Sequence, residues 1–256
     1  MIETHDLCLN IQDKPVLSNI NLTVNQGDYL VIVGPNGSGK STLLKALIGM
    51  LPFQSGDIRL NSKSITHFKK REIAKQMSFV PQENGRHLPY QVEEFVKLSR
   101  YSYHNALSEW TLADKKAVDE ALDITNTQSF KHRQMSSLSG GECQRVMIAA
   151  ALSQQTPLIL LDEPTSYLDP HHQVEIHQLI TSLNTGHNMT VVEVTHDINH
   201  AAHNNKHVVA LESGELLWQG KGNALLDASL LKKLYKQSFV FVTHPSNGRQ
   251  IALADD

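Results

Sequence analysis

The chain has 256 residues, of which 40% are hydrophobic and 19% are charged, and its formal net charge is −3. This length suffices for one large domain or for a core with a subdomain, and the weak net charge argues against a nucleic-acid or anionic-membrane partner. The N-terminus lacks a signal-peptide pattern, and no apolar run approaches the roughly 20 residues of a membrane span. The two cysteines, Cys8 and Cys143, lie far apart, which argues against a disulfide framework. We therefore expect a soluble, intracellular protein of a reducing compartment.

The first predicted elements are β-strands. Apolar residues alternate with polar ones from Leu7 to Ile11 and again from Ile20 to Val24, which predicts half-buried antiparallel strands. Residues 29–33, "YLVIV", form a short continuous apolar run. Such a run is typical of a strand that is buried on both faces.

A helical region is predicted in the middle of the chain. Between residues 92 and 126 the apolar spacing changes to that of helix faces. The stretch "TLAD" at residues 111–114 has the pattern of a capping box and predicts the start of the second helix. We expect a helical subdomain at about residues 90–155 within a single domain that covers residues 1–256.

Strands and helices alternate after Leu152. The apolar runs "LILL" and "TVVEV" predict buried strands, and a helix is expected between them from about Pro170 to Leu183. This alternation predicts a mostly parallel α/β sheet. The tail "FVFVTHPSNGRQIAL" predicts a hairpin around Asn247-Gly248.

The fourteen histidines do not show the spacing of a metal site. His171 and His172 are adjacent, so on a helix their side chains point in different directions. We interpret the scattered histidines as surface residues.

The stretch "VIVGPNGSGKSTLL" has the pattern of a phosphate-binding loop, because Gly34, Gly39, Lys40 and Ser41 satisfy G-x-x-x-x-G-K-[ST]. A predicted buried strand precedes the loop and a predicted helix follows it. In such a loop the backbone N–H groups surround the phosphates, the lysine reaches the β- and γ-phosphates, and the serine hydroxyl ligates Mg²⁺. The expected nucleotide-binding residues are Gly34, Pro35, Asn36, Gly37, Ser38, Gly39, Lys40, Ser41 and Thr42.

Two carboxylates end the strand "LILLD" further along the chain. Asp162 is placed to hold Mg²⁺, and Glu163 is placed to position or polarise the attacking water. A solvated strand end is the ordinary interpretation of such a pair. The phosphate loop in the same chain favours the catalytic one.

His196 and Gln82 each follow an apolar strand pattern. The carboxyl ends of parallel strands carry the ligand-binding residues of α/β sheets, so we expect His196 to contact the γ-phosphate and Gln82 to ligate Mg²⁺ or bind water. Alone, either residue would be interpreted as structural. Only the neighbouring motifs favour the functional interpretation.

The stretch "LSGGECQR" at residues 138–145 resembles the signature of ATP-binding cassette (ABC) ATPases. The order of motifs matches that family: phosphate loop, glutamine, signature, magnesium aspartate, the loop of residues 166–169, and histidine. The resemblance implies an α/β fold with a P-loop NTPase core and a mostly parallel sheet. An N-terminal antiparallel β subdomain and an inserted α-helical subdomain complete the implied fold. ATP and Mg²⁺ are the implied cofactors.

Gly140 and Gly141 stand at the start of a predicted helix, where free backbone N–H groups can hold an anion, so the chain has a second candidate anion-binding site. The resemblance explains its presence. In that family two cassettes pack head to tail, and each signature closes over the nucleotide of the partner. Ser139, Gly140 and Gly141 are thus expected to contact the partner's γ-phosphate, and Asp169 is expected to help close the same site. Since the chain has one signature, a homodimer is implied.

Within the family the chain is most similar to the cassettes of importers for iron chelates, haem or cobalamin, on the stretches "EPTSYLDPHHQVEIHQLI" and "LLKKLYKQSFVFVTHPSNGRQIAL". Such cassettes dock on a polytopic membrane permease at the cytoplasmic face of the inner membrane and serve a substrate-binding protein indirectly. The docking groove corresponds to residues 82–103. Two interpretations of its apolar side chains are open, a docking socket and ordinary helix packing: Leu88, Tyr90, Tyr101 and Tyr103.

Two positions depart from the family pattern. Ile11 stands where an aromatic residue usually stacks on adenine, so it offers apolar contact without a π-face. Glu142 stands where many relatives have glutamine. The rival hypothesis is a soluble ABC ATPase of an assembly system, such as an iron–sulfur scaffold; an exporter subunit and a catalytically silent clamp are further alternatives.

Overall fold

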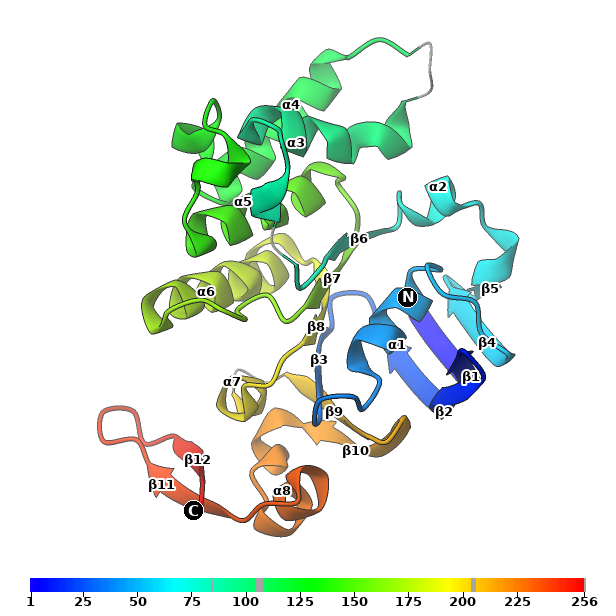
Figure 1. Cartoon of the computed structure of the whole chain (residues 1–256), viewed down its shortest axis with the longest axis vertical. Helices are drawn as coiled ribbons and strands as arrows, with labels where there is room; N and C mark the ends of the chain where they lie inside the picture. Colours follow the sequence, from blue (N-terminus) through cyan, green and yellow to red (C-terminus); the bar gives the residue numbers. More distant parts are fainter. Residues whose placement is uncertain (84, 105–107, 204–205, 256) are drawn as a thin grey trace. The chain divides into compact units, whose positions relative to one another are not determined.

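The computed structural model describes residues 1–83, 85–104, 108–203 and 206–255. Two compact units divide the chain. The first unit comprises Met1–His67 and Val192–Asp256, and the second unit comprises Phe68–Val191. Each unit is described by itself below (Figure 1).

An antiparallel sheet begins the first unit. Its strand order is β2-β1-β4-β5, and β1 pairs with both β2 and β4 in antiparallel register. Leu7, Leu9 and Ile20 point inward and are at most 1% exposed, as their alternation predicts, whereas Ile11 is 41% exposed. The strands of this sheet are β1 (Ile2–Ile11), β2 (Lys14–Val24), β4 (Ser55–Leu60) and β5 (Lys63–Ser64).

The first unit also contains a buried parallel strand pair. All five residues of β3 (Tyr29–Val33) are buried, and β3 pairs in parallel with β9 (His207–Glu212). The strand β10 (Glu215–Lys221) runs antiparallel to β9. The remaining elements of this unit are the helices α1 (Lys40–Leu47), α7 (Ile198–Ala202) and α8 (Ala228–Tyr235) and the strands β11 (Phe239–Thr243) and β12 (Gln250–Ala254).

The second unit combines a parallel strand pair with helices. The strand β6 (Met77–Val80) pairs in parallel with β7 (Leu158–Asp162), and β8 (Thr190–Val194) contributes residues to both units. The helices of the second unit are α2 (Lys70–Ile73), α3 (Val92–Leu98), α4 (Leu112–Ile124), α5 (Gly140–Ser153) and α6 (Pro170–His187). Short 3-10 segments occur at Ile65–His67, Gly85–His87, Ser99–Tyr103, Gln128–Phe130, Met135–Ser137 and Gly222–Leu225.

The predicted α/β class and the mostly parallel sheet are confirmed. Thr111 caps α4 and forms the predicted capping box with Asp114. The helix α6 begins at Pro170 as predicted but runs to His187, four residues past the predicted Leu183, and ends at Asn188 in the left-handed conformation. Antiparallel pairing of β11 with β12 confirms the C-terminal hairpin.

The helices α3, α4 and α5 fall within residues 90–155, but the two compact units follow a different division of the chain. The boundaries of a separate helical subdomain therefore stay a prediction. Across the described residues, no helix combines the length and the apolar character needed to cross a bilayer.

Candidate functional site

The phosphate-loop pattern forms a tight connection between β3 and α1 in the first unit. Gly34, Gly37 and Gly39 have φ angles of 150°, 79° and 100°, which L side chains rarely adopt. The buried strand therefore ends at Val33, and the loop turns back before α1 begins at Lys40. The N-terminus of α1 directs its partial positive charge toward this loop.

Close backbone contacts also require glycine in this loop. A Cβ atom on Gly34 would lie 2.2 Å from the carbonyl oxygen of Leu211 in β9, and a Cβ atom on Gly39 would lie 2.8 Å from Leu17 in β2. The carbonyl oxygen of Ser38 accepts a hydrogen bond from the N–H group of Gly214 at 3.1 Å. The loop is therefore held by the N-terminal hairpin and by the turn after β9.

Lys40 is buried at 5% exposure, and its side chain folds back over its own loop. Its Nζ donates to the carbonyl oxygens of Gly34 at 2.9 Å and Pro35 at 3.0 Å. The ammonium group thus lies inside the curve of the loop, together with the start of α1. This arrangement can stabilise a phosphate, which carries several negative charges.

His196 follows β8 and is exposed. The N–H group of Thr195 donates to the carbonyl oxygen of Ile32 at 3.2 Å, so the segment after β8 lies beside the end of β3. His196 and the phosphate loop therefore leave the carboxyl ends of adjacent strands, as predicted. Ile11 lies in the same unit at the end of β1, opposite Lys14 in the hairpin register.

In the second unit, β7 ends at Asp162, which is 3% exposed. Glu163 follows at 7% exposure with a φ of 51°, a left-handed conformation that non-glycine residues seldom adopt. Such strained conformations cluster at functional sites. The two carboxylates are therefore buried at a strand end rather than solvated there.

Hydrogen bonds hold the Glu163 side chain. Its Oε2 accepts from Gln82 Nε2 at 2.7 Å and from Ser166 Oγ at 3.0 Å. Because β6 and β7 pair in parallel, Gln82 and Glu163 lie just beyond the same ends of neighbouring strands. Two residues that were predicted separately as site residues are thus brought together, whereas neither their hydrogen bond nor the contact of Ser166 with the glutamate was predicted.

The signature stretch forms the N-terminus of α5. Ser139 is the N-cap: its Oγ accepts from the N–H group of Glu142 at 3.2 Å, and its own N–H group donates to Glu142 Oε2 at 2.7 Å. This reciprocal pair is a capping box. Glu142 also pairs with Arg133 at 3.0 Å, and these hydrogen bonds lower the pKa of its carboxyl group.

Asp169 is the N-cap of α6, the helix that packs beside the signature glycines. Its carboxylate accepts from the N–H group of His172 at 3.0 Å and bonds the Nδ1 atom of the His172 ring at 2.7 Å. These bonds lower the pKa of the Asp169 carboxyl group. A Cβ atom on Gly141 would lie 2.1 Å from the same ring, so glycine is required at this contact.

His172 is therefore a contact of two predicted site residues, which corrects its interpretation as an ordinary surface histidine. It is 28% exposed, whereas the neighbouring His171 is 78% exposed. That the two adjacent side chains leave the helix in different directions was predictable. The partners of His172 were not, because they depend on how α5 and α6 pack.

The candidate docking residues divide into two kinds. Tyr101 is 80% exposed and Tyr90 is 38% exposed. Tyr103 packs inward instead, since its hydroxyl donates to the carbonyl oxygen of Gln154 at 2.7 Å and its ring lies 3.9 Å from the Arg100 guanidinium. Leu88 is half-buried, and Asn84 of the proposed docking range lies outside the described residues.

Comparison with known proteins gives three consistent results. Residues 17–166 match the family model described as ABC transporter. The probable siderophore transport system ATP-binding protein YusV of Bacillus subtilis (strain 168) is 34% identical over 252 residues, covering 98% of this chain and 92% of that protein. A putative metal-chelate type ABC transporter in an inward-facing conformation matches with a TM-score of 0.86 at 28% identity, covering 100% of this chain and 97% of that one.

A fourth comparison concerns a dimer. The structure titled "Dimeric Structure of MJ0796, a Bacterial ABC Transporter Cassette" matches with a TM-score of 0.73 at 30% identity. The match covers 86% of this chain and 98% of that one. The conserved fold thus extends to a cassette whose structure was determined as a dimer.

Proposed function

The chain belongs to the ABC transporter family, and on this premise we propose that it is the ATP-hydrolysing subunit of an importer for a ferric siderophore or a related metal chelate. The chain is an ABC ATPase, since members of this family bind and hydrolyse ATP to power transport. The observation that carries the proposal is the similarity to a siderophore transport ATP-binding protein over 98% of the chain. Haem and cobalamin are the other cargoes that the sequence left open.

The proposed catalytic roles follow from the environment of each side chain. Lys40 lies within the curve of the phosphate loop and would neutralise the β- and γ-phosphates. Glu163 is buried and held by two hydrogen bonds, which suits a carboxylate that positions and polarises the attacking water. His196, beyond the end of β8, would contact the γ-phosphate.

Ser41, Asp162 and Gln82 are the proposed ligands of Mg²⁺. Their donor atoms are a hydroxyl, a carboxylate and an amide oxygen, which are the hard oxygen ligands that Mg²⁺ prefers. Because a carboxylate only accepts hydrogen bonds, the amide nitrogen of Gln82 is the atom that faces Glu163. Its amide oxygen is therefore directed elsewhere, as a metal ligand requires. Bound Mg²⁺ would neutralise charge on the transferred phosphoryl group.

The second anion site would act on the nucleotide of a partner. We propose that two copies close head to tail around ATP, with Ser139, Gly140 and Gly141 over the partner's γ-phosphate and Asp169 beside it. Hydrolysis would remove the bridging phosphate and open the dimer, so the interface would be the two-state element. The dimeric relative supports this arrangement.

The membrane partners are part of the same proposal. The chain would dock on a polytopic permease at the cytoplasmic face of the inner membrane and serve a substrate-binding protein through it. Tyr90 and Tyr101, which are exposed in the proposed docking range, are the aromatic residues best placed to contact the permease. Tyr103 is assigned to helix packing instead.

Co-purification from gently solubilised membranes tests the proposal. The tagged chain is purified, its partners are identified by mass spectrometry, and uptake of a ⁵⁵Fe-labelled siderophore is measured in a deletion strain that carries the native chain or Glu163→Gln. We expect a polytopic membrane protein in equal amount and uptake only with the native chain. Recovery of soluble partners alone, with no effect on uptake, would favour an assembly scaffold instead.

A further inference from the structure

The two helices that start at the composite-site residues touch at their N-termini. The helix α5 begins at the signature glycines, and α6 begins directly after Asp169. The His172 ring lies against Gly141, at a distance that leaves no room for a Cβ atom on that glycine. One residue of α6 thus contacts the signature and also bonds the Asp169 carboxylate at 2.7 Å.

The hydrogen bond to Asp169 determines which ring nitrogen of His172 carries a proton. A carboxylate accepts hydrogen bonds and does not donate them, so Nδ1 of His172 carries the proton. Asp169 is thereby held at two points, by the backbone N–H group and by the ring of His172. The ring cannot rotate without breaking this bond or losing its contact with Gly141.

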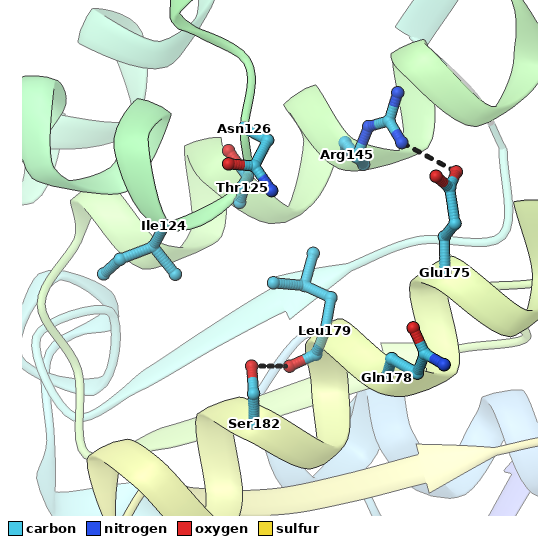
Figure 2. Close-up of a pocket in the computed structure, with 8 residues that line it drawn as sticks. All are labelled: Ile124, Thr125, Asn126, Arg145, Glu175, Gln178, Leu179 and Ser182. Atoms are coloured by element: carbon cyan, nitrogen blue, oxygen red, sulfur yellow. Dashed lines mark hydrogen bonds and ion pairs between the residues drawn. The ribbon is translucent and has the colours of Figure 1, made fainter.

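Farther along the two helices there is a second contact, followed by a pocket. Arg145 of α5 and Glu175 of α6 form an ion pair at 2.8 Å (Figure 2). A pocket of about 340 Å³ then opens beside α6, lined by the end of α4 and the two residues after it, by Arg145 of α5 and by residues of α6. Figure 2 shows Leu179 and Ser182 on α6 below this opening. The described contacts between α5 and α6 thus include His172 near the N-termini and the Arg145–Glu175 ion pair farther along.

We propose that His172 is a positioning residue that couples Asp169 to the signature glycines, so that both close over the partner's nucleotide as one unit. The inference rests on the proposed head-to-tail dimer. It assigns a role to a residue outside the proposed nucleotide-binding and metal-binding sets. The inference predicts that His172 acts on dimer closure, whereas ATP binding by the monomer rests on the phosphate loop between β3 and α1.

Three substitutions separate the two contacts of the ring. His172→Phe keeps a ring against Gly141 but has no hydrogen-bond donor for Asp169. His172→Asn keeps a donor near the position of Nδ1 but lacks the ring. His172→Ala removes both the ring and the donor. His171→Ala is the matched control, because His171 is the adjacent and more exposed residue. Each variant is made in the full chain, alone and together with Glu163→Gln.

The readouts are chosen so that a merely structural role would not reproduce them. We expect His172→Ala to lower kcat. In the Glu163→Gln background, we expect the same substitution to weaken the affinity of the MgATP-dependent dimer about tenfold. The KM for ATP and the unfolding temperature are expected to stay close to those of the His171→Ala control. The Phe and Asn variants are expected to fall between Ala and native. Wild-type kcat and dimerisation in His172→Ala would overturn the inference.

A double substitution tests the contact itself and covers the case in which a single variant folds poorly. Gly141→Ala places a methyl group against the His172 ring, so it is expected to lower the unfolding temperature, and adding His172→Ala is expected to restore it. Additive effects would contradict the contact. If Glu163→Gln stays monomeric at saturating MgATP, the proposed dimer fails and this inference with it; a Glu163→Gln dimer that forms equally well with His172→Ala overturns the inference alone.

Discussion

Replacing the buried Lys206 with methionine is expected to remove a pH dependence of folding stability. Lys206 is 1% exposed, and its Nζ lies 2.6 Å from His200 Nε2 and 4.5 Å from the centre of the Tyr29 ring. Burial lowers the pKa of this lysine from 10.5 to about 8, although the negative charge of Glu193 opposes the effect. Glu193 lies in β8, the strand that leads to His196.

The sign and size of the effect follow from these two pKa values. Between pH 8 and 10.5 the unfolded chain binds a proton at Lys206 that the folded chain does not, so the free energy of unfolding rises with pH in this window. Below pH 8 the charged ammonium costs the folded state about 3 kcal/mol, because each pKa unit corresponds to about 1.4 kcal/mol. About 2 kcal/mol of this cost disappears between pH 7.5 and 10.

Urea unfolding at pH 7.5 and at pH 10 measures this change. The rise in unfolding free energy between the two pH values is expected to be about 2 kcal/mol larger for the native chain than for Lys206→Met. Comparing the two proteins cancels the titration of groups that both contain. An equal rise in both proteins would refute the assignment of a lowered pKa to Lys206.

Three further predictions concern the nucleotide site and the N-terminus of α5. Glu163→Gln is expected to lower ATP hydrolysis by about 10²- to 10⁴-fold and to trap an ATP-bound dimer, seen as a doubling of mass by light scattering; a strictly monomeric variant would contradict dimer closure. Lys40→Ala is expected to abolish hydrolysis because the phosphates lose their ammonium partner, and normal turnover would refute the site. Glu142→Ala keeps the hydrogen bond from its backbone N–H group to Ser139 Oγ but loses the acceptor for the Ser139 N–H group and the Arg133 pair, so it is expected to lower the unfolding free energy by about 1 kcal/mol. Glu142→Gln keeps an acceptor for the Ser139 N–H group and loses only the charge of the Arg133 pair, so urea unfolding is expected to show a smaller loss.

Much of the fold was predictable because local pattern and tertiary structure agree in this chain. The alternation around Leu7 and Leu9 matches their burial in β1, and the apolar run before Gly34 matches the fully buried β3. Helix boundaries were less predictable. The helix α6 ends at His187 and not at the predicted Leu183, because the polar residues of its last turn are compatible with a solvated helix face as well as with a loop.

The site residues were predictable for a different reason. Phosphate binding requires particular residue types at fixed spacing, so Lys40 and Glu163 are recognised from their neighbours in the sequence. Ile11 shows the limit of this reasoning. Its alternation with Leu9 predicted burial, yet it is 41% exposed at the end of β1, where an apolar surface is available to a ligand.

Contacts between motifs could not be predicted, because they depend on which helices pack together. Ser166 bonds Glu163, and His172 joins Asp169 to Gly141. In the sequence, Ser166 and His172 are polar residues that no pattern marks as contacts of the site. Only the packing of α5 against α6 gives the histidine its partners. The same packing makes Gly141 sterically necessary in addition to its proposed contact with phosphate. A loss of activity in Gly141→Ala would therefore not by itself demonstrate a phosphate contact, and the double substitution with His172→Ala is needed to separate the two causes.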